Sequence, residues 1–113
     1  MSLRPITVFT LGGTIAMAPD GPSGGAVPAL DADALLGALP ELAQVAEISA
    51  RNFRELPGAH LSLDDILGLA RAIEGARDEG AAGAVVTQGT DTIEETAFIL
   101  DTVLDPAFPV VVT

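Results

Sequence analysis

The sequence contains no cysteine, lysine, tyrosine or tryptophan. Without cysteine there is no disulfide framework, no thiolate metal site and no thiol nucleophile. Much amide and phosphate chemistry places a lysine or a tyrosine beside the nucleophile. A chain without either must use other groups for such chemistry or obtain them from elsewhere. No apolar run approaches the length of a membrane-spanning helix.

Positive charge is also scarce, because five arginines stand against sixteen acidic residues and give a formal net charge of -11. Nucleic-acid backbones and anionic membrane surfaces both attract clustered cations, so we expect neither as a partner. The acidic side chains are expected to be solvated and to keep the chain soluble. We find no signal peptide, since one arginine precedes a short apolar run without a small-residue cleavage site, and this favours the cytoplasm.

The 113 residues, almost half of them apolar, are enough for one small domain with a core. Apolar runs bounded by glycine and proline predict strands over residues 6–11, 44–53, 83–87 and 108–113. Asp31 is expected to cap a short helix over residues 32–39 that Pro40 closes. Two capping boxes, Ser62 with Asp65 and Thr92 with Glu95, predict the starts of two longer helices.

The longer helices are expected to bury one stripe each, formed by Leu63, Ile66, Leu67, Ala70 and Ile73 and by Ile93, Ala97, Leu100 and Leu104. Alternation of strand and helix through the chain predicts an α/β fold: a parallel sheet with helices on both faces, in a flavodoxin-like, three-layer arrangement. Residues 12–28 are rich in glycine and proline and are expected to form a long loop or lid. A last apolar strand favours a truncated piece of a longer protein.

Two predicted strands end in glycine and threonine. "LGGTIA" follows the first strand and "TQGTDT" follows the strand over residues 83–87. Open α/β sheets bind ligands beyond the carboxyl ends of their strands. Glycines let backbone N–H groups approach a ligand, and threonines supply hydroxyl groups. Read alone, each motif fits a turn or a helix cap, but together they predict a small-molecule site. Neither has the spacing of a dinucleotide fingerprint or a phosphate loop.

The segments "LGGTIAM" and "VVTQGTDTIEETAF" closely resemble the bacterial-type L-asparaginases, including the asparaginase-glutaminases. Both signature motifs, Gly-Gly-Thr-Ile and Gly-Thr-Asp-Thr, are present in order and at a similar separation. The resemblance covers nearly the whole chain. It implies that residues 1–113 are part of the N-terminal α/β domain, with the remainder of that domain and the C-terminal domain absent.

The resemblance also implies roles. Thr14 matches the nucleophile that attacks the side-chain amide, and Thr90 and Asp91 match the second catalytic threonine and its neighbouring carboxylate. Gly13 and Gly89 lie in the same motifs and are expected to contact the substrate. The implied substrate is L-asparagine, with L-glutamine as a second amide, and no cofactor or metal is expected. A homo-oligomer, commonly a tetramer, is implied.

The sequence departs from the family pattern at three places. The family's flap tyrosine has no counterpart, and its substrate-gripping Ser-Gln aligns with Gly58 and Ala59, whose backbone amides could still bind a carboxylate. His60 lies beside them as a further candidate contact. The family's catalytic lysine would lie beyond residue 113. Two alternatives stay open: the amidohydrolase subunit of a transfer-RNA amidotransferase, and a non-catalytic flavodoxin-like module that binds a small anion.

Overall fold

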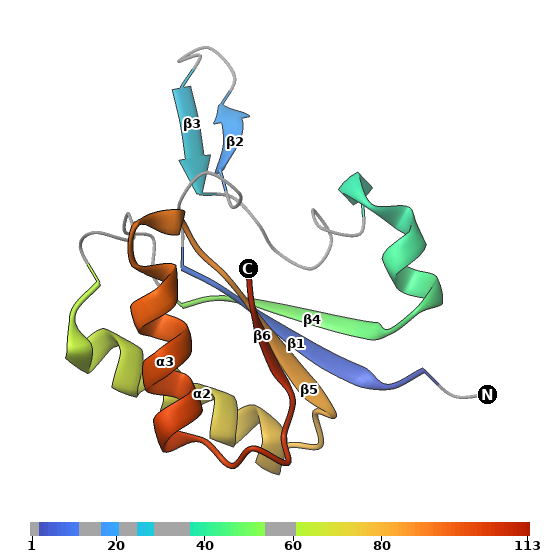
Figure 1. The fold of residues 1–113 in the computed structure, drawn as a ribbon. Coiled ribbons are helices and arrows are strands. Elements are labelled where there is room, and N and C mark those ends of the chain that lie inside the picture. The colour runs from blue at the N-terminus through green and yellow to red at the C-terminus, as the bar shows by residue number, and fades with distance from the viewer. Residues whose placement is uncertain (1–2, 12–16, 21–24, 29–36, 54–60) are drawn as a thin grey trace.

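The computed structural model describes residues 3–11, 17–20, 25–28, 37–53 and 61–113 (Figure 1). Its main sheet consists of β1 (Pro5–Thr10), β4 (Glu47–Asn52), β5 (Gly83–Thr87) and β6 (Val110–Val112). The strands lie in the order β4-β1-β5-β6, and each neighbouring pair is parallel. The predicted α/β fold with a parallel sheet is therefore confirmed.

The two central strands, β1 and β5, carry the two motifs. The chain continues from β1 to β4 on one side of the sheet and from β5 to β6 on the other. The strand order thus reverses between β1 and β5, as it does in flavodoxin-like sheets, where ligands bind outside the carboxyl ends of the strands at this reversal. The residues that follow Thr10 and Thr87 are therefore the candidates for a ligand-binding site.

Helix α2 (Leu63–Asp78) begins at the capping box that the sequence predicts. The Asp65 N–H donates to Ser62 Oγ at 3.1 Å, and the Ser62 N–H donates to Asp65 Oδ2 at 3.0 Å. The helix ends before Gly80, whose φ of +109° is readily adopted only by glycine. Its buried residues are Ile66, Leu69, Ala70, Ile73 and Ala76. The predicted stripe is wrong at Leu63, which is exposed because it lies in the first turn, N-terminal to the buried residues.

Helix α3 (Ile93–Val103) follows a short 3-10 turn, η3 (Thr90–Thr92). The predicted capping box of Thr92 and Glu95 is wrong, since no side-chain cap bond forms at Thr92. Thr92 has φ -128° and ψ 24°, which is not the extended conformation of a capping residue. Leu100 is buried as expected, whereas Ala97 is exposed and Thr96 takes a place in the interior.

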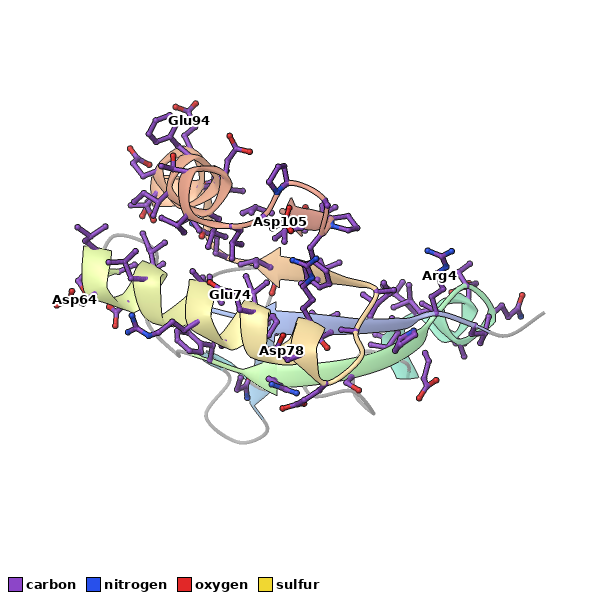
Figure 2. All side chains as sticks on the ribbon, turned by 90° about the horizontal axis from the view of Figure 1, so that it is seen from below. Arg4, Asp64, Glu74, Asp78, Glu94 and Asp105 are labelled. Atoms are coloured by element: carbon purple, nitrogen blue, oxygen red, sulfur yellow. The ribbon has the colours of Figure 1, made fainter. Side chains whose placement is uncertain are left out.

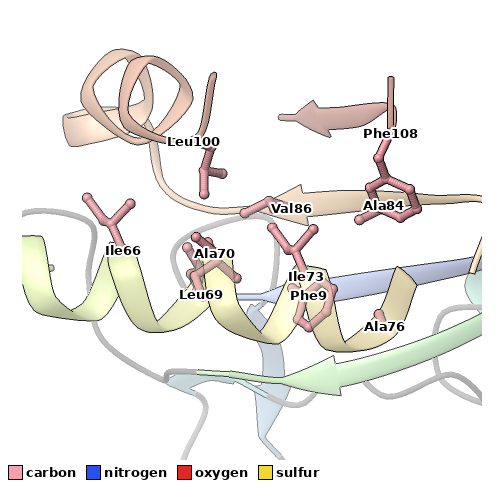
Figure 3. Packing of buried hydrophobic residues seen from close by; sticks show 11 residues of the cluster. Phe9, Ile66, Leu69, Ala70, Ile73, Ala76, Ala84, Val86, Leu100 and Phe108 are labelled. Atoms are coloured by element: carbon pink, nitrogen blue, oxygen red, sulfur yellow. The ribbon is translucent and has the colours of Figure 1, made fainter. Parts of the chain in front are cut away.

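Both long helices lie on the same face of the sheet, where one hydrophobic cluster joins them (Figure 3). Phe9 of β1 and Val86 of β5 meet Leu69 and Ile73 of α2 and Leu100 of α3 in this cluster. Each such side chain, when fully buried, stabilises the fold by about 1.5–3 kcal/mol. The expectation of helices on both faces is therefore not met by α2 and α3, because the connections β4–α2–β5 and β5–α3–β6 progress across the sheet in the same direction.

The connection from β1 to β4 differs from the expected long loop. Strands β2 (Met17–Asp20) and β3 (Gly25–Pro28) pair antiparallel as a hairpin. Asp31 and residues 32–36 of the expected short helix lie outside the described residues, and residues 37–38 are helical. The helical residues end at residue 38, before Pro40 as expected, and Pro40 itself begins the 3-10 helix η1 (Pro40–Gln44), where its missing N–H costs no hydrogen bond. This element delays the start of β4 to Glu47.

Acidic side chains lie over α2, α3 and the turn before β6, as Asp64, Glu74, Asp78, Glu94 and Asp105 in Figure 2 show. All five are exposed, as expected for solvated charges. None of the helices in the described ranges is long and apolar enough to cross a membrane.

Candidate functional site

Backbone hydrogen bonds bring the carboxyl ends of the strands to one edge of the sheet. The Leu11 N–H donates to the Thr87 carbonyl at 2.9 Å, and the Phe53 N–H donates to the Thr10 carbonyl at 2.9 Å. On the other side of β5, the Gln88 N–H donates to the Thr113 carbonyl at 3.0 Å. The segments that follow β1 and β5 therefore leave the sheet from adjacent positions.

Gly89, Thr90 and Asp91 form the turn between β5 and α3. Gly89 has extended backbone angles and precedes η3, in which Thr90 and Asp91 are both exposed. The turn leads directly into α3, whose N-terminal end carries a partial positive charge from the helix dipole. The structure thus presents a hydroxyl and a carboxylate to solvent, at the edge of the sheet where β1 also ends.

Gln88 is completely buried directly before this turn. Its Nε2 donates to the Gly89 carbonyl at 3.1 Å and to Thr92 Oγ1 at 3.3 Å. The side chain therefore bonds both to the residue that opens the turn and to the residue that closes it. Within the described ranges, Gln88 Oε1 has no hydrogen-bond partner.

A second polar group lies across three neighbouring strands at the same edge. Thr10 is paired in register with Asn52 on one side and with Thr87 on the other. Thr10 Oγ1 donates to Asn52 Oδ1, and the buried Thr87 Oγ1 has no partner among the residues that the structure describes. Phe9 and Leu11 point toward the helices, so the alternation of a strand puts Thr10 on the opposite face.

Several predicted site residues cannot be compared with this geometry. Thr14, Gly13, Gly58, Ala59 and His60 lie outside the described residues. The structure brings together the strand ends that carry the two motifs.

A groove of about 490 Å³ lies elsewhere, between α3 and β6. Its lining is mostly aliphatic and includes Leu100, Leu104, Phe108 and Val110, together with the carboxylates of Asp101 and Asp105. Among the described residues, those that line it include none from the Gly-Gly-Thr-Ile or Gly-Thr-Asp-Thr motif and none with a hydroxyl group. Because amide chemistry of the expected kind needs a hydroxyl nucleophile, we assign the candidate site to the sheet edge instead.

Sequence reasoning missed Gln88 and the row formed by Thr10, Asn52 and Thr87. A signal for Gln88 was available, since it stands two residues after the buried Val86, where the alternation of a strand predicts an apolar side chain. The polar row carries no comparable signal, because threonine is common in ordinary strands.

Comparison with known proteins gives a consistent result. The family model described as "Asparaginase, N-terminal" matches residues 5–113. A glutamyl-tRNA(Gln) amidotransferase subunit from Methanothermobacter thermautotrophicus is 36% identical over 111 residues, which are 98% of this chain and 26% of that protein. An L-asparaginase from Bacillus licheniformis is 39% identical over 117 residues, covering 97% of this chain and 34% of that protein.

Among solved structures, a probable cytoplasmic L-asparaginase from Campylobacter jejuni matches with a TM-score of 0.81 and 33% identity, over 96% of this chain and 32% of that one. The chain thus spans about a quarter to a third of the length of these relatives. The fold and the site place the chain among α/β proteins that carry threonine motifs where the strand order of a parallel sheet reverses. Within this class, the chain belongs to the asparaginase family and corresponds to its N-terminal part.

Proposed function

We propose that the full-length protein containing this chain is a cytoplasmic amidohydrolase that converts L-asparagine to L-aspartate and ammonia. The observation that carries this proposal is the adjacency of the ends of β1 and β5, which is fixed by the Leu11–Thr87 hydrogen bond of 2.9 Å. The two family motifs begin at these ends. Thr14 follows Leu11 by three positions in the sequence.

In this proposal the Thr14 hydroxyl attacks the side-chain amide carbon of the substrate. The threonine oxygen forms an ester bond with this carbon as the carbon–nitrogen bond breaks, and the hydroxyl proton passes to the nitrogen, which leaves as ammonia. Water then hydrolyses the ester to aspartate and restores the threonine hydroxyl. Backbone N–H groups of the two glycine-threonine segments stabilise the oxyanion, a contribution of roughly 3 kcal/mol for one such donor. Asp91 binds the α-amino group of the substrate, and Gly58, Ala59 and His60 contribute to holding it.

The proposal predicts that valine at either threonine removes activity, because valine keeps the shape of threonine and lacks its hydroxyl. We expect Thr14→Val and Thr90→Val in the full-length protein to lower the rate of ammonia release from asparagine at least about 10³-fold. Thr102→Val is the matched control. Thr102 is exposed on α3, and its hydroxyl bonds only to the Phe98 carbonyl within the described structure, at 2.8 Å. Near-normal turnover by Thr90→Val would remove Thr90 from the mechanism.

A second function is favoured by a specific finding, since relatives such as the one from Methanothermobacter are amidotransferase subunits by name. The same assay separates these two functions, and a measurement of aspartate binding identifies the non-catalytic module. Ammonia release from asparagine by the purified protein alone supports the asparaginase. Release that requires a partner subunit supports an amidotransferase, and aspartate binding without any release supports the non-catalytic module.

A further inference from the structure

The carboxamide of Gln88 is fixed in one orientation by its surroundings. Its Nε2 lies 3.1 Å from the Gly89 carbonyl oxygen, and a carbonyl oxygen can only accept a hydrogen bond. The nitrogen of the side chain must therefore face Gly89, and the same nitrogen donates to Thr92 Oγ1 at 3.3 Å. These two bonds connect the residue before η3 to the last residue of η3, with Thr90 and Asp91 between them.

This arrangement leaves Gln88 Oε1 buried without a donor among the described residues. A buried acceptor that has lost water and gained no partner destabilises a fold. An apolar side chain of similar length would fill the same space without that cost. Within the described structure, the hydrogen bonds that the Gln88 side chain makes are the two that hold the turn, and an apolar side chain would lose both.

We propose that Gln88 is a positioning residue of the active site. It fixes the backbone of the turn that presents Thr90 and Asp91, and it does not itself contact the substrate. This inference rests on the proposed function, because a defined turn matters for turnover only if Thr90 and Asp91 act on an amide. Displacement of a reacting group by about 1 Å can lower a rate about 100-fold.

The test compares Gln88→Met with Thr96→Val in the full-length protein. Methionine keeps the length and volume of glutamine but cannot donate to the Gly89 carbonyl. Thr96 is a fair control because it is also fully buried, and its hydroxyl has no partner within the described structure. It lies on α3 one turn after Thr92, outside the Gly89–Thr92 turn that Gln88 holds.

We expect Gln88→Met to lower kcat for asparagine about 10- to 100-fold, with a smaller effect on KM and a melting temperature close to that of the wild type. Thr96→Val is expected to keep the wild-type kcat. Hydrogen exchange of the backbone amides of residues 90–93 should be faster in Gln88→Met alone, because the turn loses both bonds to the side chain.

The kinetic, stability and hydrogen-exchange measurements test different parts of the inference. A wild-type kcat in Gln88→Met overturns the inference. A large fall in melting temperature with a normal kcat for the folded enzyme also overturns it, since it assigns Gln88 a purely structural role. If the wild-type protein releases no ammonia, the proposed function fails. The exchange rates then still decide whether Gln88 holds the turn.

Discussion

Single residues near the end of β5 combine deep burial with incomplete hydrogen bonding. Thr87 Oγ1, Gln88 Oε1 and Thr96 Oγ1 are all buried, and none has a partner in the part of the chain that the structure describes. Most buried polar atoms in folded proteins are paired, so three such atoms within ten residues mark an unusual segment. Local rules tend to fail where a protein carries a site. Thr87 and Gln88 directly precede the Gly-Thr-Asp-Thr motif, whereas Thr96 lies one helical turn beyond it.

At the same scale, Asp105 has a pKa lower than its ordinary value of 3.8. The main cause is the Ala107 N–H, which donates to the carboxylate at 2.9 Å, followed by the Arg77 guanidinium at 2.9 Å. A lowered pKa in the folded state stabilises the fold above pH 3.8, and this contribution disappears as the pH falls through the lower value. The stabilisation is small because both partners are exposed to solvent.

We expect an NMR titration of the Asp105 carboxyl carbon to give a midpoint below 3.8. Arg77→Gln should raise that midpoint only in part, because the bond from Ala107 remains. A midpoint at or above 3.8 for Asp105 in the wild type would contradict the prediction.

At the scale of elements, prediction from sequence succeeds where the signal is local and fails where the environment decides. The bounds of β5 and the capping box at Ser62 follow from apolar runs and capping chemistry, and both are observed as predicted. The box at Thr92 fails because Thr92 is drawn into a 3-10 turn and bonds to Gln88. The hairpin of β2 and β3 was missed because glycine and proline are typical of loops.

The capping box of α2 gives a direct test of element stability. Ser62→Ala removes the acceptor for the Asp65 N–H and should lower the free energy of unfolding by about 1 kcal/mol. Ser49→Ala is the control, since Ser49 is exposed in β4 and should change stability by less than about 0.5 kcal/mol. Urea denaturation of both variants measures the difference. Equal urea midpoints for Ser62→Ala and Ser49→Ala would show that the cap does not contribute to stability.

At the scale of the whole molecule, one core on one face of the sheet holds both helices. Ile73 lies fully buried in it, so Ile73→Ala should destabilise the protein by about 2–5 kcal/mol through the cavity it leaves. Val45, which is 69% exposed, gives the control Val45→Ala with a change below about 0.5 kcal/mol. Thermal unfolding followed by circular dichroism measures both. A small shift for Ile73→Ala would mean that the core relaxes into the space.

The sheet and its topology class were predictable, whereas the candidate site was predictable only as a pair of motifs. Strand alternation and capping signals determine the parallel sheet, and the sheet determines that Thr10 and Thr87 end side by side. The bonds made by Gln88 depend on how α3 packs against the end of β5, which no local pattern encodes. The predicted roles of Thr14 and Thr90 come from the family resemblance and stay predictions.

The central position of β1 has a kinetic consequence. Its neighbours β4 and β5 are contributed by residues roughly 40 and 80 positions later, and pairings this distant in sequence form slowly because long loops must close first. The two motifs cannot become adjacent until β5 has docked onto β1. A chain in which β5 has not yet paired with β1 therefore lacks the adjacent strand ends on which the proposed function depends.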